Sequence, residues 1–347
     1  MPTINNKLAF ASDYQKGAHP DILRRLAEMN MTPFTGYGQD AVCAEAKEMI
    51  RKACGCPQAE VEFLVGGTQT NATVIDAFLR IYQGVIAAET GHVNLHEAGA
   101  IEAGGHKVLT VPQSLGKLSA DSVRTYLRNF YDDVNHEHMV MPGMVYISQP
   151  TEYGTLYSKA ELQELHDVCR EYGISLFADG ARLAYALACE ENDVSLRDLA
   201  ELCDVFYIGG TKCGALMGEA VVIPDPSRVP GFFTIIKQHG ALLAKGWLLG
   251  IQFSELFRDG LYLSIGAPAI KAADRIRAAL VEKGYRLYID TPTNQIFVIM
   301  ENEDLKAFSE KVEYGFWEKY DENHTVIRLA TDWAATEEDV AALIDIL

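Results

Sequence analysis

The sequence has few of the features that mark secreted, membrane-bound or nucleic-acid-binding proteins. Its seven cysteines are an odd number and form no CxxC pair, which indicates reduced thiols in a cytoplasmic protein. Lys and Arg total 30 against 48 Asp and Glu, and a formal net charge of −18 argues against nucleic acid and anionic membranes as partners. The N-terminus has no signal-peptide pattern, and the apolar stretch ALLAKGWLLGIQF is broken by Lys245 and is too short to span a bilayer. We therefore expect a cytoplasmic protein that binds a small molecule.

Signatures of two common nucleotide-binding classes are also absent. The sequence contains no GxGxxG turn for a dinucleotide, and no Gly-Lys-Ser/Thr completes a Walker A loop. His136 and His138 stand two residues apart beside Asp132 and Asp133, but a solvated loop accounts for this cluster better than a metal site does. We therefore expect no metal, and the chemistry has to come from another source.

What is present is a chain with enough apolar residues for a sizeable core. Its 347 residues, 48% of them hydrophobic, predict two domains, or one large domain and a smaller one. From about residue 60 to 223, short apolar runs alternate with stretches of helical spacing, including a helix predicted over 68–84 and closed by Gly84. This alternation predicts an α/β fold, with a mostly parallel sheet covered by helices on both faces.

After about residue 240 the pattern changes to that of a small α+β unit with an antiparallel sheet. We place the boundary near residue 245, so that residues 16–244 form the large domain and residues 245–347 the small one. We assign residues 1–15 to the small domain, either paired with it or lying across the active site.

Polar residues follow five of the apolar runs, at the point where each predicted strand ends. In open α/β sheets the carboxyl ends of parallel strands meet at one edge, and active sites form there. We therefore expect one site built from the following segments: 66–68, 89–92, 149–152, 179–182 and 209–212.

Lys212 is the only basic residue in YIGGTKCGALMGEAVV, and it follows an apolar strand and two glycines. Burial disfavours an ammonium ion, so this amine is a candidate for Schiff-base chemistry, although a lysine that extends to solvent is the alternative. Asp179 ends an upstream strand and needs a cationic partner, and residues 67–69 open a helix whose N-terminus can hold a phosphate. Of the cofactors considered, pyridoxal phosphate alone uses all three features, with its aldehyde, ring nitrogen and phosphate.

Motifs along nearly the whole chain, roughly residues 7 to 340, resemble the threonine aldolases of the β-eliminating lyase group. The resemblance implies a fold type I architecture of pyridoxal phosphate-dependent enzymes, and it is closest to the low-specificity and phenylserine aldolase branch. The matching motifs are FASDYQKGAHP, GYGQD, GGTQTN, ETGHVNLHEAGAIE, SQPTEYGTLYS, ADGARL, GGTKCGALMGEAVV and IIKQHGALLAK.

The resemblance also implies roles for individual residues. Lys212 would bind the cofactor aldehyde, Asp179 the ring nitrogen, and His92 would stack on the ring and transfer protons. Tyr37 and Lys237 match positions that reach a neighbouring subunit's site, so we expect a homo-oligomer of catalytic dimers, a tetramer. The implied cofactor-binding residues are Gly67, Thr68, Gln69, His92, Asp179, Arg182, Thr211, Lys212 and Lys237, and the implied substrate-binding residues are Ser12, Tyr37, His96, Glu152, Arg182 and Arg328.

The implied activity is retro-aldol cleavage of a β-hydroxy-α-amino acid, threonine-like, to glycine and an aldehyde. Glu152 stands where many family members have a histidine, and His96 where the branch often has an acid. These departures leave the substrate preference open. Other pyridoxal phosphate reactions, namely β-elimination, transamination or racemisation, and a non-catalytic binding protein are the alternatives.

Structural roles remain open for some of these residues as well. Arg182 could balance Asp179 in an internal ion pair, Arg328 could be a surface strand residue, and His92 could be a structural histidine.

Overall fold

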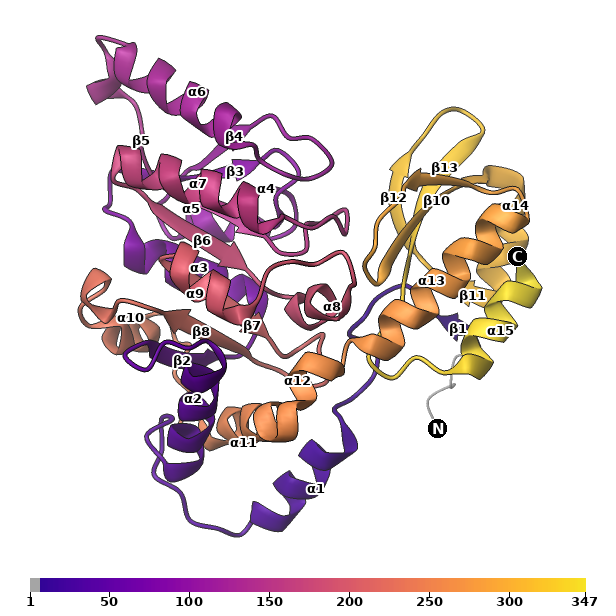
Figure 1. Cartoon of the computed structure of the whole chain (residues 1–347), viewed down its shortest axis with the longest axis horizontal. Coiled ribbons are helices and arrows are strands. Elements are labelled where there is room, and N and C mark those ends of the chain that lie inside the picture. Colours follow the sequence, from indigo (N-terminus) through magenta and orange to yellow (C-terminus); the bar gives the residue numbers. More distant parts are fainter. Residues whose placement is uncertain (1–6) are drawn as a thin grey trace.

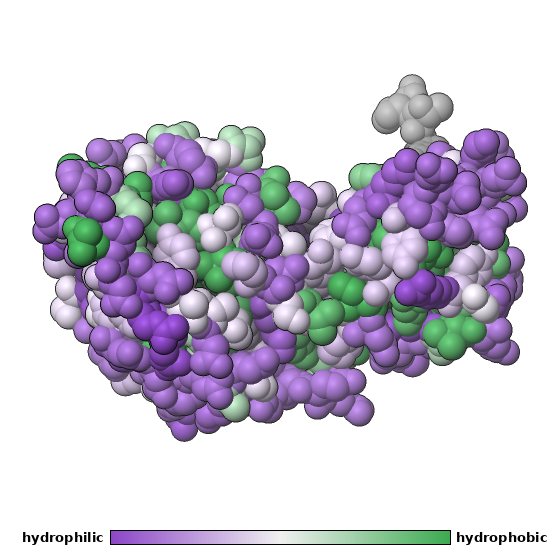
Figure 2. Space-filling model, turned by 90° about the horizontal axis from the view of Figure 1, so that it is seen from above, coloured by the Kyte–Doolittle hydropathy of each residue, from purple (hydrophilic) through white to green (hydrophobic). Residues whose placement is uncertain are grey.

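A computed structural model describes residues 7–347, so part of the N-terminal segment assigned to the small domain lies outside the described residues. The chain forms a larger α/β unit and a smaller unit beside it (Figure 1). Viewed from above, the surface is hollowed where the two units meet (Figure 2). No helix among the described residues is long and apolar enough to cross a membrane.

The larger unit is built on a seven-stranded sheet with the strand order β2-β8-β7-β6-β5-β3-β4. The five strands from β7 to β4 pair in parallel, and β8 is antiparallel to both of its neighbours, which confirms the mostly parallel sheet. The strands are β2 (Glu60–Leu64), β3 (Gln83–Ala88), β4 (Val108–Val111), β5 (Met141–Ser148), β6 (Ser175–Asp179), β7 (Val205–Gly209) and β8 (Glu219–Ile223).

Helices cover both faces of this sheet, because the central strands are apolar on both sides. Every residue of β6, β7 and β8 is buried, as expected for strands between two helical layers. One face packs on α3 (Gly67–Phe78), α4 (His92–Leu95), α5 (Ala100–Ala103) and α10 (Phe232–Gln238). The other packs on α2 (Ala41–Ala53), α6 (Ala120–Asp132), α7 (Lys159–Tyr172), α8 (Leu183–Ala188) and α9 (Leu196–Leu202), and α1 (Pro20–Met29) belongs to the same apolar cluster.

The ends of α7 follow the capping residues in the sequence, whereas the end of α3 does not. Ser158 caps the N-terminus of α7 and Gly173 ends it with a φ of 66°, as the sequence predicted. The helix expected over 68–84 is shorter, since α3 ends at Phe78 and Gly84 lies inside β3. A Cβ at Gly84 would lie 2.5 Å from the carbonyl oxygen of Lys107, so this glycine permits close strand packing rather than ending a helix.

The smaller unit contains a four-stranded antiparallel sheet in the order β12-β13-β10-β9. The N-terminal strand β1 (Leu8–Ala9) pairs in parallel with β11 (Val312–Glu313) of this unit. The other elements are β9 (Arg286–Ile289), β10 (Gln295–Glu301), β12 (Gly315–Lys319), β13 (His324–Ala330), α13 (Ala267–Glu282), α14 (Asn302–Lys311) and α15 (Glu337–Ile346).

Two helices after residue 245 belong to the core of the larger unit. Helix α11 (Trp247–Phe257) packs against α1 and α2, and α12 (Leu261–Ser264) packs against α8. Leu249, Phe253 and Tyr262 lie in the same apolar cluster as the strands of the large sheet. The sequence analysis placed the domain boundary near residue 245, whereas the apolar core of the larger unit includes residues as far as α12.

Candidate active site

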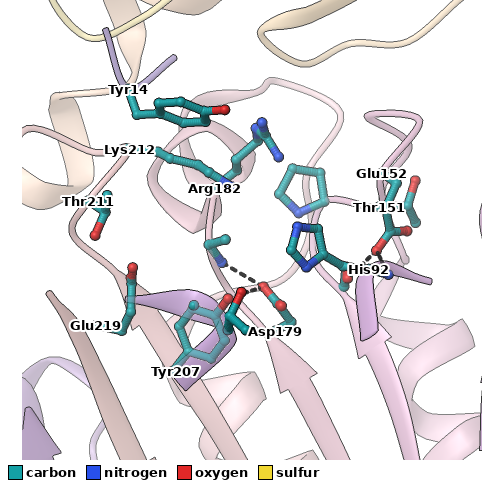
Figure 3. Close-up of a pocket in the computed structure, with 15 residues that line it drawn as sticks. Tyr14, His92, Thr151, Glu152, Asp179, Arg182, Tyr207, Thr211, Lys212 and Glu219 are labelled. Carbon is teal, nitrogen blue, oxygen red and sulfur yellow. Dashed lines mark hydrogen bonds between the residues drawn. The ribbon is translucent and has the colours of Figure 1, made fainter. Parts of the chain in front are cut away.

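A cavity of about 230 Å³ lies at the carboxyl ends of the parallel strands, where the sequence analysis expected the site. Figure 3 shows the side chains that converge there from β6, β7, β8 and α4. Tyr14 of the N-terminal segment also lines the cavity, so this segment both pairs with the smaller unit and reaches the site. The predicted residues that line it are Gly67, Thr68, His92, Glu152, Asp179, Arg182, Thr211 and Lys212.

Asp179, at the end of β6, is a buried carboxylate held by neutral donors. Its Oδ2 accepts hydrogen bonds from Tyr146 Oη at 2.6 Å and Asn71 Nδ2 at 3.1 Å, and its Oδ1 accepts from Tyr207 Oη and from the backbone N–H of Ala181. Burial raises the pKa of Asp179, but the charge of His92 in its protonated form and the two tyrosine hydrogen bonds outweigh it and hold the pKa below its usual value. The carboxylate is therefore ionised.

No ion pair neutralises Asp179 within residues 7–347: the salt bridges of this part of the chain do not include it. The expected alternative, an ion pair with Arg182, is not formed. A buried carboxylate without a cation is costly, so the cavity is suited to a ligand that brings a positive charge to this point.

Lys212 follows β7 on a turn that only glycine allows. A Cβ at Gly209 would lie 2.4 Å from the carbonyl oxygen of Ala181, and a Cβ at Gly210 would lie 2.7 Å from that of Gly218. Burial lowers the pKa of the Lys212 ammonium and the charge of Arg182 lowers it further, against the opposing effect of nearby carboxylates. The amine is thus prepared to act as a nucleophile.

The N-terminus of α3 supplies free backbone N–H groups to the cavity. Gly66 precedes the helix and has no side chain with which to cap it, and Gly67 and Thr68 line the cavity. A Cβ at Gly67 would lie 3.3 Å from Tyr207 Oη, so glycine keeps this approach open. Such a helix end suits an anion. Gln69 turns away, since its Oε1 accepts from the backbone N–H of Val65 at 3.3 Å.

His92 and Glu152 are joined at the rim of the cavity. Glu152 Oε1 accepts from the backbone N–H of His92 at 2.8 Å and from Ser148 Oγ at 2.7 Å. Burial raises the pKa of Glu152 despite these hydrogen bonds. The imidazole of His92 contacts Glu97, whose Oε1 lies 2.8 Å from Nδ1. Sequence analysis gave Glu97 no role.

Arg182 pairs with Asp13, a residue that the sequence analysis passed over. Asp13 Oδ2 accepts from Arg182 Nε at 2.6 Å and Oδ1 from Nη2 at 3.0 Å, and Asn294 Nδ2 donates to Oδ2 at 2.9 Å. Burial raises the pKa of Asp13, but Arg182 overcomes this effect and lowers the pKa to about 2. The position of Asp13 beside Ser12 in FASDYQKG was the available signal.

Arg328 and Ser12 offer unused donors from the smaller unit. Arg328 Nη2 donates to the carbonyl oxygen of Ala11 at 2.9 Å, but its Nε is buried without a partner among residues 7–347, and so is Ser12 Oγ. Arg328 is therefore not a surface strand residue. Burial and the charge of Arg182 lower the pKa of Arg328. Unpaired buried donors of this kind fit an anionic group such as a carboxylate.

The remaining predicted residues lie around the cavity or apart from it. His96 has its ring centroid 5.6 Å from that of His92 and 6.5 Å from that of Trp317, and partial desolvation of the imidazole together with the charge of protonated His92 lowers its pKa. Lys237 Nζ lies 4.4 Å from the ring centroid of Tyr37. Neither Tyr37 nor Lys237 lines the cavity of their own chain.

Comparison with solved structures defines the class of the fold. A mutant of the aspartate aminotransferase of Thermus thermophilus has the same fold, with a TM-score of 0.69 and 16% identity over 98% of this chain and 95% of that chain. The architecture is that of the fold type I pyridoxal phosphate enzymes. Threonine aldolase of Leishmania major is more similar, with a TM-score of 0.94 and 43% identity over 97% of this chain and 98% of that chain.

Comparison of sequences gives the family. The low specificity L-threonine aldolase of Pseudomonas sp. (strain NCIMB 10558) is 31% identical over 308 residues, 87% of each chain, and that of Pseudomonas aeruginosa is 31% identical over 305 residues, 86% of each chain. The sequence model of the beta-eliminating lyases matches residues 9–295. The chain belongs to the beta-eliminating lyase family, which confirms the resemblance seen in the motifs.

The Asp13–Arg182 pair predicts a pH-dependent contribution to stability. We expect Asp13→Asn to lower the free energy of unfolding by about 3–5 kcal/mol at pH 7, because it leaves a buried guanidinium without a counter-charge. The ordinary pKa of 3.8 falls to about 2 in the fold, so the pair stabilises above pH ~4. The difference between wild type and variant in urea unfolding should therefore shrink as the pH falls from about 4 to about 2.

Asp121→Asn is the matched control for this experiment. Asp121 pairs with Arg124 on the surface, its side chain is 95% exposed, and its loss should change stability by less than about 1 kcal/mol. A variant of Asp13 that is no less stable than the Asp121 control would contradict the assignment.

Proposed function

We propose that this protein is a pyridoxal phosphate-dependent aldolase that cleaves β-hydroxy-α-amino acids such as threonine to glycine and an aldehyde. The observation that carries the proposal is the pairing, in one cavity, of an amine with a lowered pKa at Lys212 and an ionised, buried carboxylate without a cation at Asp179. The names of the relatives at 31% and 43% identity, all threonine aldolases, support the reaction.

The residues present fit the proposed cofactor. Lys212 would bind its aldehyde carbon, Asp179 its protonated ring nitrogen, and the free N–H groups at Gly67 and Thr68 its phosphate. When bound, pyridoxal phosphate supplies an electron sink for the electron pair of the broken Cα–Cβ bond. The further residues we assign to this site are Gln69 through its backbone N–H, His92, Arg182, Thr211 and, from the neighbouring subunit, Lys237.

The chain's own groups would orient the substrate and move its proton. The unpaired donors of Ser12 and Arg328, with Arg182 beside them, would bind the substrate carboxylate and so fix the direction of the Cα–Cβ bond. His92 would accept the β-hydroxyl proton at Nε2, which makes no hydrogen bond within residues 7–347. Glu152 and His96 would contact the substituents of Cβ and set the preference among aldehydes.

We also propose that the protein works in the cytoplasm as a tetramer of two catalytic dimers. All seven cysteines are free and buried, which suits a reducing compartment. The Tyr37–Lys237 pair lies outside the cavity of its own chain and leaves Tyr37 42% exposed, which suits a contribution to a neighbouring site.

Glycine release tests the activity directly. We expect purified protein supplied with pyridoxal phosphate to release equimolar glycine and aldehyde from threonine or phenylserine, and Lys212→Ala to release neither, because the amine that binds the cofactor is lost. Release of ammonia and a keto acid instead would identify a β-elimination and reject the aldolase. Chromatographic detection of both products is the measurement.

Asp179→Asn tests the electron sink. We expect the variant to bind the cofactor but to keep less than about a tenth of the wild-type kcat, a barrier increase above ~1.4 kcal/mol, because a neutral amide does not hold the ring nitrogen protonated. Asp204→Asn removes another buried carboxylate, just before β7 at the opposite edge of the sheet, and serves as the control for lost stability. Equal kcat losses in the two variants would rule out this role for Asp179.

Mixing two inactive variants tests the shared site. We expect sedimentation to give a tetramer, and hybrids of Lys212→Ala and Lys237→Ala subunits to recover activity. In such a hybrid one site has its own Lys212 and takes Lys237 from the Lys212→Ala subunit, so that site is complete. Hybrids no more active than the Lys237→Ala protein alone would show that each subunit uses its own Lys237.

A further inference from the structure

Glu97 is a buried carboxylate whose position serves one side chain of the site. Its side chain is 0% exposed, and its Oε1 contacts His92 Nδ1 at 2.8 Å and Asn71 Nδ2 at 2.7 Å. Its Oε2 is buried and has no partner in residues 7–347. A carboxylate so poorly compensated is costly to bury, so packing alone gives no reason for it.

The contact with Glu97 determines which nitrogen of His92 carries the proton in the neutral ring. An ionised carboxylate only accepts hydrogen bonds, so Nδ1 has to be the donor. Nε2 is then left with a free lone pair, and His92 lines the cavity (Figure 3). The contact therefore makes the nitrogen that faces the ligand a proton acceptor.

Asn71 joins this pair to the carboxylate that would bind the ring nitrogen. Its Nδ2 donates one hydrogen to Glu97 Oε1 at 2.7 Å and the other to Asp179 Oδ2 at 3.1 Å. The opposite amide orientation would set Asn71 Oδ1 against two carboxylate oxygens, so the orientation is fixed by charge. One amide therefore holds both carboxylates in place.

A second series of polar contacts runs from Asp179 to the backbone of His92. Asp179 Oδ2 accepts from Tyr146 Oη, Ser148 Oγ lies 3.3 Å from that hydroxyl and donates to Glu152 Oε1, and Glu152 accepts from the backbone N–H of His92. His92 is thus fixed both at its backbone and at its imidazole. Networks of this kind hold a catalytic group within the narrow range of positions that proton transfer needs.

We propose that Glu97 and Asn71 are positioning residues: Glu97 fixes the Nδ1–H tautomer of His92, and Asn71 ties Glu97 to Asp179, so that Nε2 acts as the base beside the cofactor. This inference rests on the proposed aldolase function for its kinetic consequence, but the tautomer itself is a property of the protein alone. An experiment can therefore reject the aldolase function without rejecting the tautomer of His92, and the reverse.

Glu97→Leu removes the acceptor and tests the tautomer. Solid-state ¹⁵N NMR of full-length protein labelled at histidine, with and without cofactor, reports the protonated nitrogen, and the signal missing in His92→Gln assigns His92. We expect Nδ1–H in wild type and Nε2–H, the form that free histidine favours in water, in Glu97→Leu. For the cofactor-bound variant we expect kcat for glycine release to fall by about 10²–10⁴-fold, with KM nearly unchanged, since proton transfer is lost rather than binding.

Glu97→Gln and Asn71→Ala distinguish the effect of the charge at position 97 from the effects of the shape and orientation of the side chain there. In Glu97→Gln the amide oxygen can take the place of Oε1, because Asn71 Nδ2 favours an oxygen there. We therefore expect this variant to keep Nδ1–H and more of the wild-type kcat than Glu97→Leu. Combined with Asn71→Ala, the glutamine loses its orienting partner, and the retained activity should be lost by more than the two single effects add up to.

Asp321→Leu is the matched control. Asp321 Oδ1 contacts His324 Nδ1 at 2.8 Å on the smaller unit, so its loss should change the His324 signal and leave kcat unaltered.

Two results would overturn the proposal. One is Nε2–H on His92 in wild type, and the other is a Glu97→Leu variant that keeps wild-type kcat per bound cofactor and shows only a lower melting temperature. Should Glu97→Leu fail to fold, the Glu97→Gln and Asn71→Ala variants decide by the same two measurements. Wild type with Nδ1–H but no glycine release would reject the aldolase and leave the tautomer assignment standing.

Discussion

A negative charge buried at the end of β6 is the constraint on which the rest of the site depends. Asp179 is held by two tyrosine hydroxyls, an amide and a backbone N–H, none of which carries a charge. The three side-chain donors come from β5, β7 and α3, so the sheet and one helical layer have to pack before this buried charge is stabilised. The buried, uncompensated charge lowers the stability of the protein without ligand, and a ligand with a positive charge would offset this cost.

Much of the fold and the centre of the site could be predicted because each depends on local signals. Glycines and polar residues after apolar runs mark strand ends, and the geometry of parallel strands then brings Lys212, Asp179, His92 and Glu152 to one edge without knowledge of any contact. Ser158 likewise marks the start of α7 through the hydrogen bond of its own side chain to the backbone.

The parts that could not be predicted depend on partners distant in the sequence. Tyr146 and Tyr207 look like ordinary apolar strand residues, and only the register of β5, β6 and β7 turns their hydroxyls to Asp179. Arg182 was a candidate partner for Asp179, yet Asp13, far away in the chain, accepts hydrogen bonds from its Nε and Nη2. The end of α3 was misplaced because apolar residues continue past Phe78, although Ile81 is 93% exposed.

The contacts of Asp13 also connect the two units. Asp13 binds Arg182 in the larger unit and Asn294 in the smaller one, while its own segment adds a strand to the smaller unit's β11. The N-terminal segment therefore holds the two units together at the junction that Figure 2 shows as a hollow. Arg328 of the smaller unit donates to the carbonyl oxygen of Ala11 in the same segment, so the segment that binds Arg182 through Asp13 also contacts the arginine that we propose for the substrate carboxylate.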